Sequence, residues 1–330
     1  MGRRQARAAT PEDLVKRRKT GERHGVILVD KARGPSSAAL VAEVGRALGG
    51  VRAGHAGTLD PMATGLMVVC VGEATKLATF LSGADKEYVA EAVLGVRTDT
   101  LDADGKVVGE PADASAVQAI DEAAVRRVLA GLTGPIQQVP PMYSALKREG
   151  RPLYELAREG VEVEREARAI TVHELELLAF TPGPRATVRF RVFASKGTYV
   201  RVLAADLGEQ LGVGAHLVAL RRTRAGAFSV DEATPHAGLG ERLAAGSGGG
   251  VPLIPMAEAL RGFARVLVDD VAARRVRDGQ RLDAAGLDPA LAGFPLATPL
   301  AVLSEGGARL VAVAEVEAGG ALHAIRGFST

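Results

Sequence analysis

The loop at residues 54–65, which reads GHAGTLDPMATG, holds a single carboxylate, Asp60. Its glycines allow tight backbone paths and the close approach of a partner molecule. Pro61 fixes its own φ and biases Asp60 towards an extended backbone. An aspartate before a proline often only caps a turn. A carboxylate held this stiffly is nevertheless a candidate for nucleophilic or acid–base catalysis.

A cation that needs an anion nearby follows the sequence SKGTYV at residues 195–200. Arg201 falls in the first turn of a helix expected over residues 199–211, where the helix dipole disfavours positive charge. An arginine at that place predicts a negatively charged partner. The alternative is an arginine that faces solvent or a phosphate group.

Apolar periodicity predicts a mixture of strands and helices around these residues. Expected strands cover residues 25–30, 66–71, 86–96 and 186–196, and expected helices cover 37–48, 73–82, 121–131 and 199–211. Ser36 or Ser37 is the candidate N-cap of the first helix. Because strands and helices do not alternate strictly, the pattern favours an α+β core around a large sheet.

Composition divides the chain into segments. Residues 1–24 are basic and poor in large apolar side chains, which is typical of a disordered tail. Residues 238–250 are rich in small residues such as glycine and alanine and are the best linker candidate. We therefore expect one domain at 25–237 and a small β-rich domain at 251–330, with apolar segments at 264–268, 300–303 and 310–316.

Length and composition exclude several classes of protein. A chain of 330 residues that is 47% hydrophobic and 24% charged is an ordinary globular protein, and its net charge of +2 neither demands nor excludes nucleic acid. The single cysteine, Cys70, lies in an apolar run, which favours a reducing cytoplasm and excludes an intrachain disulfide. We expect no membrane span, no metal and no cofactor. The acidic stretch at 99–105 resembles a calcium loop, but Pro111 occupies the position that would require Glu.

The loop at 54–65 resembles the signature of the TruB family of tRNA pseudouridine synthases. Further motifs of that family follow in its order, namely GEATK (72–76), KEY (86–88), GVRTDT (95–100), PPMYSALK (140–147), LYELAR (153–158), REAR (165–168), SKGTYVR (195–201), GAHL (214–217) and LRR (220–222). The resemblance covers roughly residues 24 to 230. One motif departs from the family, since Lys-Pro-x-Gly reads KARG at 31–34, with Ala32 in place of proline.

The resemblance implies a pseudouridine synthase fold and its reaction. The C1′–N1 bond of a uridine breaks, the base turns, and it is rejoined through C5, without a cofactor. Asp60 would be the catalytic carboxylate and Arg201 its partner, because a cation within about 4–6 Å lowers a carboxyl pKa by roughly 1–3 units. Tyr88 would be the third catalytic residue and would stack on the base, a contact worth about 1–3 kcal/mol. Whether Asp60 attacks C1′, attacks the base or removes a sugar proton stays open.

The resemblance also implies how RNA is held. Flipping a base out of its stack costs a few kcal/mol, and His55 would fill the gap while Leu220 packs against the base. Residues 140–160 interleave cations with aromatic residues and match the family's mobile thumb, although a solvated charged helix is an alternative. The other expected substrate contacts are Lys31, Lys76, Tyr143, Lys147 and Tyr199, and Lys31 is also expected to support the loop near the site.

The expected substrate is uridine 55 in the T loop of tRNA, modified by a cytoplasmic monomer without an obligate protein partner. The runner-up is the guide-RNA-dependent relative of box H/ACA particles, which lacks the sequence motifs found here at residues 142–156. A different class is an RNA chaperone of the same fold, against which Asp60, Tyr88 and Arg201 together argue. Residues 251–330 resemble the PUA RNA-binding module only loosely.

Overall fold

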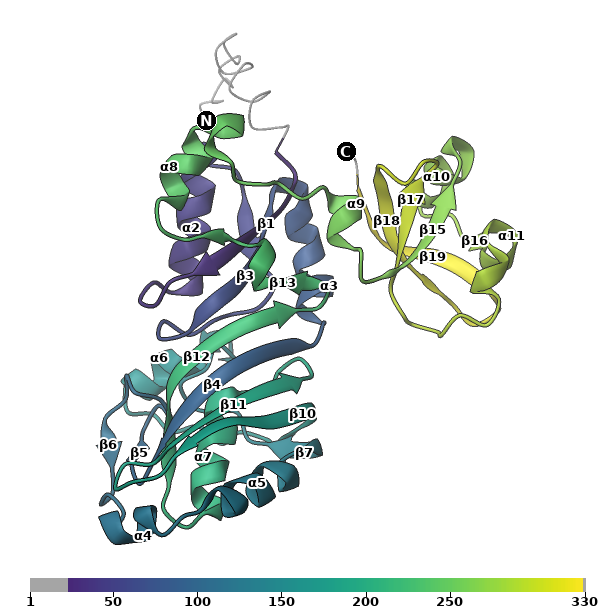
Figure 1. Cartoon of the computed structure of the whole chain (residues 1–330). Coiled ribbons are helices and arrows are strands. Elements are labelled where there is room, and N and C mark those ends of the chain that lie inside the picture. The colour runs from purple at the N-terminus through teal and green to yellow at the C-terminus, as the bar shows by residue number, and fades with distance from the viewer. Residues whose placement is uncertain (1–22, 329–330) are drawn as a thin grey trace, which may run out of the picture.

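A computed structural model describes residues 23–328, in which two separate sheets carry the architecture (Figure 1). Residues 1–22 of the expected basic tail lie outside this description. The larger sheet has the order β14-β1-β3-β12-β4-β11-β10-β7, and β2 and β13 pair with β3 and β12. Its strands are β1 (Gly25–Lys31), β2 (Ala53–His55), β3 (Thr64–Val71), β4 (Lys86–Leu94), β7 (Gly134–Gln138), β10 (Arg168–Thr181), β11 (Thr187–Ala194), β12 (Ala215–Ala225), β13 (Phe228–Ser229) and β14 (Thr234–Pro235).

The large sheet is mixed. The pairs β1–β14 and β3–β12 are parallel, whereas the other neighbours run antiparallel. Helices pack on it: α5 contacts β10, α7 contacts β12, and α2 contacts both β2 and α8. The helices of this part are α2 (Ser37–Ala47), α3 (Ala78–Ser82), α4 (Ala114–Gln118), α5 (Glu122–Gly131), α6 (Leu153–Arg158), α7 (Val200–Gln210) and α8 (Leu239–Ala244), with 3₁₀ turns η1 (Gly72–Leu77) and η2 (Val230–Glu232). The α+β class expected from the sequence is confirmed.

Burial explains why the strands differ in sequence. In β3, Met67 and Val69 enter one apolar core while Leu66, Val68 and Cys70 enter another, so the strand is covered on both faces and reads as a continuous apolar run. β4 instead alternates between buried and partly exposed residues, because only one of its faces is covered. Ser36 caps α2 by accepting a hydrogen bond from the Ala39 amide at 3.1 Å, as one of the two candidates predicted.

The second sheet lies in the C-terminal part, with the order β15-β17-β18-β19-β16. Its strands are β15 (Ala264–Val268), β16 (Leu282–Asp283), β17 (Leu300–Ser304), β18 (Leu310–Val316) and β19 (Ala321–Gly327), with helices α9 (Met256–Ala259), α10 (Asp270–Arg277) and α11 (Ala284–Leu287) beside them. Leu303 and Phe328 share one apolar cluster with Leu28 and Leu66 of the large sheet. The small domain therefore covers the outer face of β1 and β3.

The prediction of a linker over 238–250 was wrong for most of that range. Residues 239–244 form α8, and residues 246–249 form a 3₁₀ turn, η3 (Gly246–Gly249). Leu239 and Leu243 are buried in the core beside α2. The linker was predicted from the glycine-rich composition of this segment. Its two leucines at i and i+4 nevertheless form an apolar face on one helical turn. Across residues 23–328, no helix has the length and apolarity needed to cross a membrane.

Candidate active site

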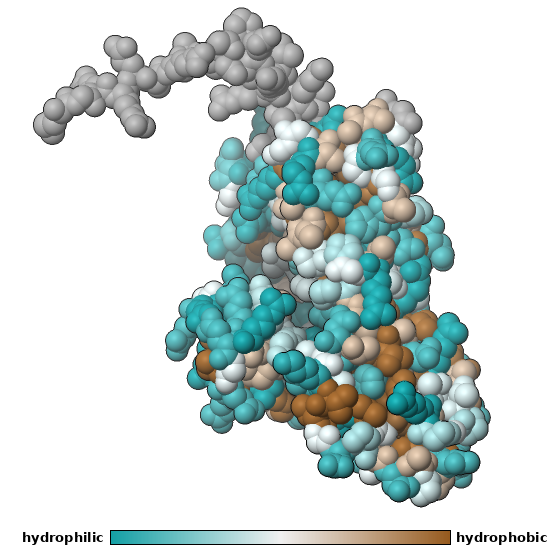
Figure 2. Space-filling model, turned by 90° about the vertical axis from the view of Figure 1, so that its left-hand side faces the viewer, coloured by the Kyte–Doolittle hydropathy of each residue, from teal (hydrophilic) through white to brown (hydrophobic). Residues whose placement is uncertain are grey.

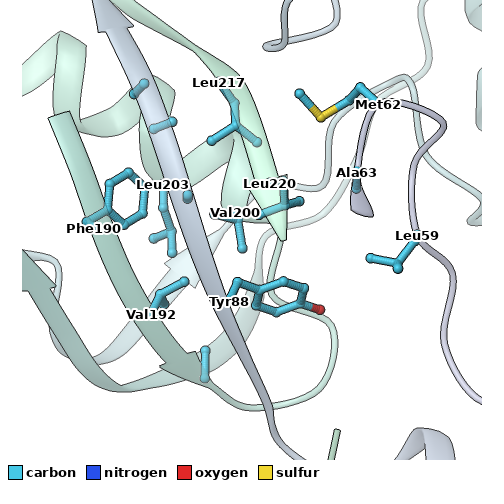
Figure 3. Close-up of a cluster of buried hydrophobic side chains, with 14 of the residues drawn as sticks. Leu59, Met62, Ala63, Tyr88, Phe190, Val192, Val200, Leu203, Leu217 and Leu220 are labelled. Atoms are coloured by element: carbon cyan, nitrogen blue, oxygen red, sulfur yellow. The ribbon is translucent and has the colours of Figure 1, made fainter. Parts of the chain in front are cut away.

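Five residues predicted to act together line one cavity of about 440 Å³: Asp60, Tyr88, Tyr199, Arg201 and Leu220. They come from a loop before β3, from β4, from the start of α7 and from β12. Figure 3 shows Tyr88 and Leu220 in an apolar wall, with the Tyr88 hydroxyl pointing towards the loop that carries Leu59. The large sheet therefore brings together side chains that are up to 160 positions apart, from Asp60 to Leu220.

Asp60 and Arg201 form the ion pair expected from the sequence. The Arg201 Nε lies 2.9 Å from Asp60 Oδ2, and the arginine is only 3% exposed. Its guanidinium also donates to the carbonyls of Thr100 at 2.6 Å and Tyr143 at 2.8 Å. A second carboxylate, Asp102, lies 3.5 Å from Arg201 Nη1. One arginine thus ties the Asp60 loop to two further loops.

The pKa of Asp60 is raised, whereas the ion pair with Arg201 was expected to lower it. Burial raises the pKa of the Asp60 carboxyl above its ordinary value, and this exceeds the opposing effect of Arg201, while Asp102 adds repulsion. The side chain nevertheless keeps 32% of its surface accessible, so water reaches one side of it. The cost of desolvating the carboxyl is larger than the gain from its ion pair.

Two buried polar residues hold the Asp60 loop from below. Lys31 has no exposed surface, and its Nζ donates to the carbonyls of Ala63 at 2.7 Å and Asp60 at 3.2 Å. Ser37 Oγ binds both backbone groups of Leu59, each at 2.8 Å. Lys31 thus supports the loop near the site, as expected from its motif, and it does not belong to the cavity lining.

Arg222 supports the same loop from β12. It is 1% exposed and donates to the carbonyls of Leu66 at 2.7 Å and Gly57 at 3.2 Å. Gly65 lies beside it with φ +99°, and a Cβ there would come within 2.3 Å of the Arg222 carbonyl oxygen. Only glycine lets β3 and β12 approach this closely.

The segment expected to be a thumb borders the cavity, although through other side chains than predicted. Ser144, Ala145 and Leu146 line the cavity, whereas Tyr143 contributes its backbone carbonyl to Arg201. Lys147 is exposed on a short hairpin of β8 (Lys147–Arg148) and β9 (Arg151–Pro152). The side carrying α6 is mainly hydrophilic in Figure 2, with hydrophobic surface gathered in its lower half.

The remaining predicted contacts lie in different surroundings. Tyr199 is held by Gln138, whose amide group binds both the Tyr199 N–H at 2.7 Å and its carbonyl at 3.2 Å.

His55 ends β2 outside the cavity lining, with a buried Nδ1 that has no hydrogen-bond partner among residues 23–328. Burial, followed by the charge of Arg222, lowers the His55 pKa, so the ring is neutral at pH 7. Lys76 pairs with Glu73 and lies 5.9 Å from the Phe328 ring, away from the cavity lining.

Three residues of the site were not among the predicted ones. Asp102 lies in the acidic stretch at 99–105, and nothing in its local sequence shows that it meets Arg201. Lys86 and Arg222 also line the cavity. A signal existed for both, since each is two residues from a predicted cavity residue on the same strand, and side chains at i and i+2 share one face.

Comparisons with known proteins show which family the chain resembles. A model of the TruB family pseudouridylate synthase N-terminal domain matches residues 46–200, and a model of the tRNA pseudouridylate synthase B C-terminal domain matches residues 201–241. The tRNA pseudouridine synthase B of Aromatoleum aromaticum is 54% identical over 209 residues, which cover 63% of this chain and 65% of that protein. The tRNA pseudouridine synthase B of Symbiobacterium thermophilum is 51% identical over 255 residues, which cover 77% and 82%.

A solved structure shows a similar fold. It is a chain of an H/ACA RNP bound to a substrate RNA containing 2′-deoxyuridine. It superposes with a TM-score of 0.69 at 25% identity, over 93% of this chain and 85% of that one. The likeness extends beyond the residues matched by the family models and includes most of the C-terminal sheet.

Proposed function

The chain belongs to the TruB family of pseudouridine synthases, and from this we propose that it isomerises uridine 55 in the T loop of tRNA to pseudouridine. The observation that carries the proposal is the Asp60–Arg201 pair at 2.9 Å in a cavity lined by Tyr88, Tyr199 and Leu220. A positioned carboxylate, a fixed cation and an aromatic face are what base isomerisation requires.

Asp60 is the catalytic carboxylate in this proposal. Attack on C1′, attack on the base and removal of a sugar proton all require its charged form. Burial raises the pKa of Asp60, which makes the carboxylate more basic and less solvated than a surface aspartate. Arg201 opposes protonation and fixes the orientation of the carboxylate, because its other donors are held by backbone carbonyls.

The flipped uracil lies between the apolar wall and the Asp60 loop. Tyr88 supplies the stacking surface and Leu220 packs against the base, and both are more than nine-tenths buried. Tyr199 closes another side of the cavity, where Gln138 fixes its backbone. His55 carries a neutral ring at pH 7 and is suited to replace the lost stacking next to the extruded base.

Two features support a stand-alone tRNA enzyme over a guide-RNA-dependent one. Residues 144–146 line the cavity itself. They belong to the segment whose sequence favours the stand-alone branch. The relatives with 51% and 54% identity are named tRNA pseudouridine synthase B, whereas the H/ACA chain is 25% identical. We assign catalysis to residues 25–237 and RNA contacts to the thumb segment at 140–160, in a cytoplasmic monomer without an obligate partner protein.

The test uses unmodified tRNA transcripts and the full chain alone. Carbodiimide labelling should reveal pseudouridine at position 55, and a transcript with cytidine at that position should remain unlabelled. Pseudouridine at another position would contradict the site assignment. Activity that appears only after a guide RNA is added would favour the runner-up function.

A further inference from the structure

Lys86 shares one face of the large sheet with the proposed stacking residue. It begins β4 two positions before Tyr88, and both side chains are buried. Across the ladder to β12, Tyr88 pairs with Arg222, Ala90 pairs with Leu220, and Lys86 pairs with Ala225. A base stacked on Tyr88 therefore has Leu220 on one side along the sheet and Lys86 on the other.

The Lys86 ammonium is enclosed in the cavity wall. The residue is 7% exposed, and its Nζ donates to the carbonyls of Ser82 at 2.6 Å and Ala84 at 2.5 Å. These two bonds leave one N–H without an acceptor in the described part of the chain. Its Cε lies 3.6 Å from the position of a Cβ built on Gly57, at the edge of the Asp60 loop.

Lys86 has no carboxylate within ion-pair distance among residues 23–328. The nearby acid, Asp85, contacts His173 Nε2 at 3.1 Å instead. Burial and then the charge of Arg222 lower the Lys86 pKa to about 8, against the attraction of Asp85. The lysine is thus still charged at pH 7, in a wall where another cation repels it.

Capping α3 does not account for this arrangement. The carbonyls of Ser82 and Ala84 lie at the end of α3, where water or an exposed lysine can satisfy them. Burying an ammonium without a carboxylate partner is costly. A charge kept at that cost in a ligand-sized cavity is typical of a functional group.

We propose that the Lys86 ammonium donates a hydrogen bond to an oxygen of the departing uracil and stabilises the negative charge that this base carries. The role rests on the proposed function and adds a third charged group to Asp60 and Arg201. Arg222 is a positioning residue beside it, since its own donors are engaged by the Asp60 loop and β3.

When the C1′–N1 bond breaks, its electron pair stays on N1, and the uracil anion spreads this charge onto O2 and O4. C1′ is completed by a bond to an Asp60 oxygen or by loss of the C2′ proton to Asp60. After the base turns, the C5–C1′ bond forms. In the first case the Asp60 carboxylate leaves C1′, and in the second Asp60 returns the proton to C2′. C5 then loses a proton and N1 gains one. Lys86 keeps its proton throughout and binds most strongly while the base is anionic.

A comparison of two substrates separates this role from a structural one. Single-turnover rates are measured for wild type and Lys86→Met on a tRNA transcript, and on the same transcript with 5-fluorouridine at the target position. Fluorine at C5 stabilises the uracil anion by itself and reduces the need for Lys86. Lys86→Met should slow pseudouridine formation by about 100-fold, as loss of one donor to a developing anion does. On the second RNA, the rate is measured as the disappearance of the 5-fluorouridine nucleoside from digests. Lys86→Met should slow this rate by a clearly smaller factor.

Two further variants keep the test decisive. Lys86→Gln retains a donor for the α3 carbonyls without the charge and should show the same difference between substrates. Lys106→Met removes an exposed lysine and should change neither rate. Equal slowing on both RNAs by both Lys86 variants would overturn the proposal. A wild-type protein that modifies no uridine would instead refute the proposed function on which it rests.

Discussion

Replacing Arg201 with Met should almost abolish isomerisation, and the structure sets the size of the effect. Arg201 is 3% exposed and contacts two carboxylates and two carbonyls. Removing one preorganised electrostatic contact to a reacting group costs about 2.7–4 kcal/mol of transition-state stabilisation. At about 1.4 kcal/mol for each factor of ten, we expect a loss of roughly 100-fold to 1,000-fold.

Arg201→Lys provides the comparison. Lysine keeps the positive charge but lacks the planar fork that reaches Asp60, Thr100 and Tyr143 together. Its rate should therefore fall between that of wild type and that of Arg201→Met. Tritium release from C5-labelled tRNA under single-turnover conditions measures all three proteins.

Thermal melting and RNA binding serve as controls for folding. Both variants should remain folded at the assay temperature and should bind tRNA nearly as wild type does, since bond breaking is not a phosphate contact. Rates within a factor of three of wild type for both variants would refute the role of Arg201. A lysine variant as slow as the methionine variant would show that geometry, rather than charge, is decisive.

Three further outcomes follow from the site. His55→Ala should slow the reaction more on folded tRNA than on a loosened T-arm stem-loop, because unstacking costs less when the base is already free; single-turnover rates on both RNAs measure this, and equal losses would place His55 elsewhere. Ser37→Ala should lower stability by about 1–3 kcal/mol, because the buried Leu59 amide loses its partner, and an unchanged unfolding midpoint in urea would count against that support. Burial raises the pKa of Asp60, and the carboxylate is the active form, so the rate should fall as pH drops through a value above an ordinary carboxyl pKa. A pH series of single-turnover rates checks this, and an acid limb at the ordinary value would contradict it.

The sequence predicts much of the fold because single strands carry clear patterns. In β11, Val188, Phe190 and Val192 are buried and alternate with Arg189 and Arg191, as the period of two requires. The pairing order of the large sheet, with β12 between β3 and β4, leaves no local trace. It depends on contacts between distant segments, which periodicity does not report.

The same limit applies to the site. Asp60 and Tyr88 lie in sequence motifs, and the position of Arg201 in the first turn of its helix predicts a nearby anion. The second anion, Asp102, meets Arg201 only because the loop after β5 (Arg97–Thr98) folds back against α7. The motif at 31–34 places Lys31 near the Asp60 loop, but it does not show that the ammonium is buried and bound to loop carbonyls. Burial of a long charged side chain is a property of packing and not of its neighbours in sequence.

The most direct test of the central claim is Asp60→Asn, assayed for pseudouridine at position 55 of a tRNA transcript. The substitution keeps the volume of the side chain and removes its charge, in the cavity where Arg201 holds it at 2.9 Å. We expect no detectable isomerisation together with nearly unchanged tRNA affinity. Residual turnover within tenfold of wild type would contradict the assignment of Asp60 as the catalytic carboxylate.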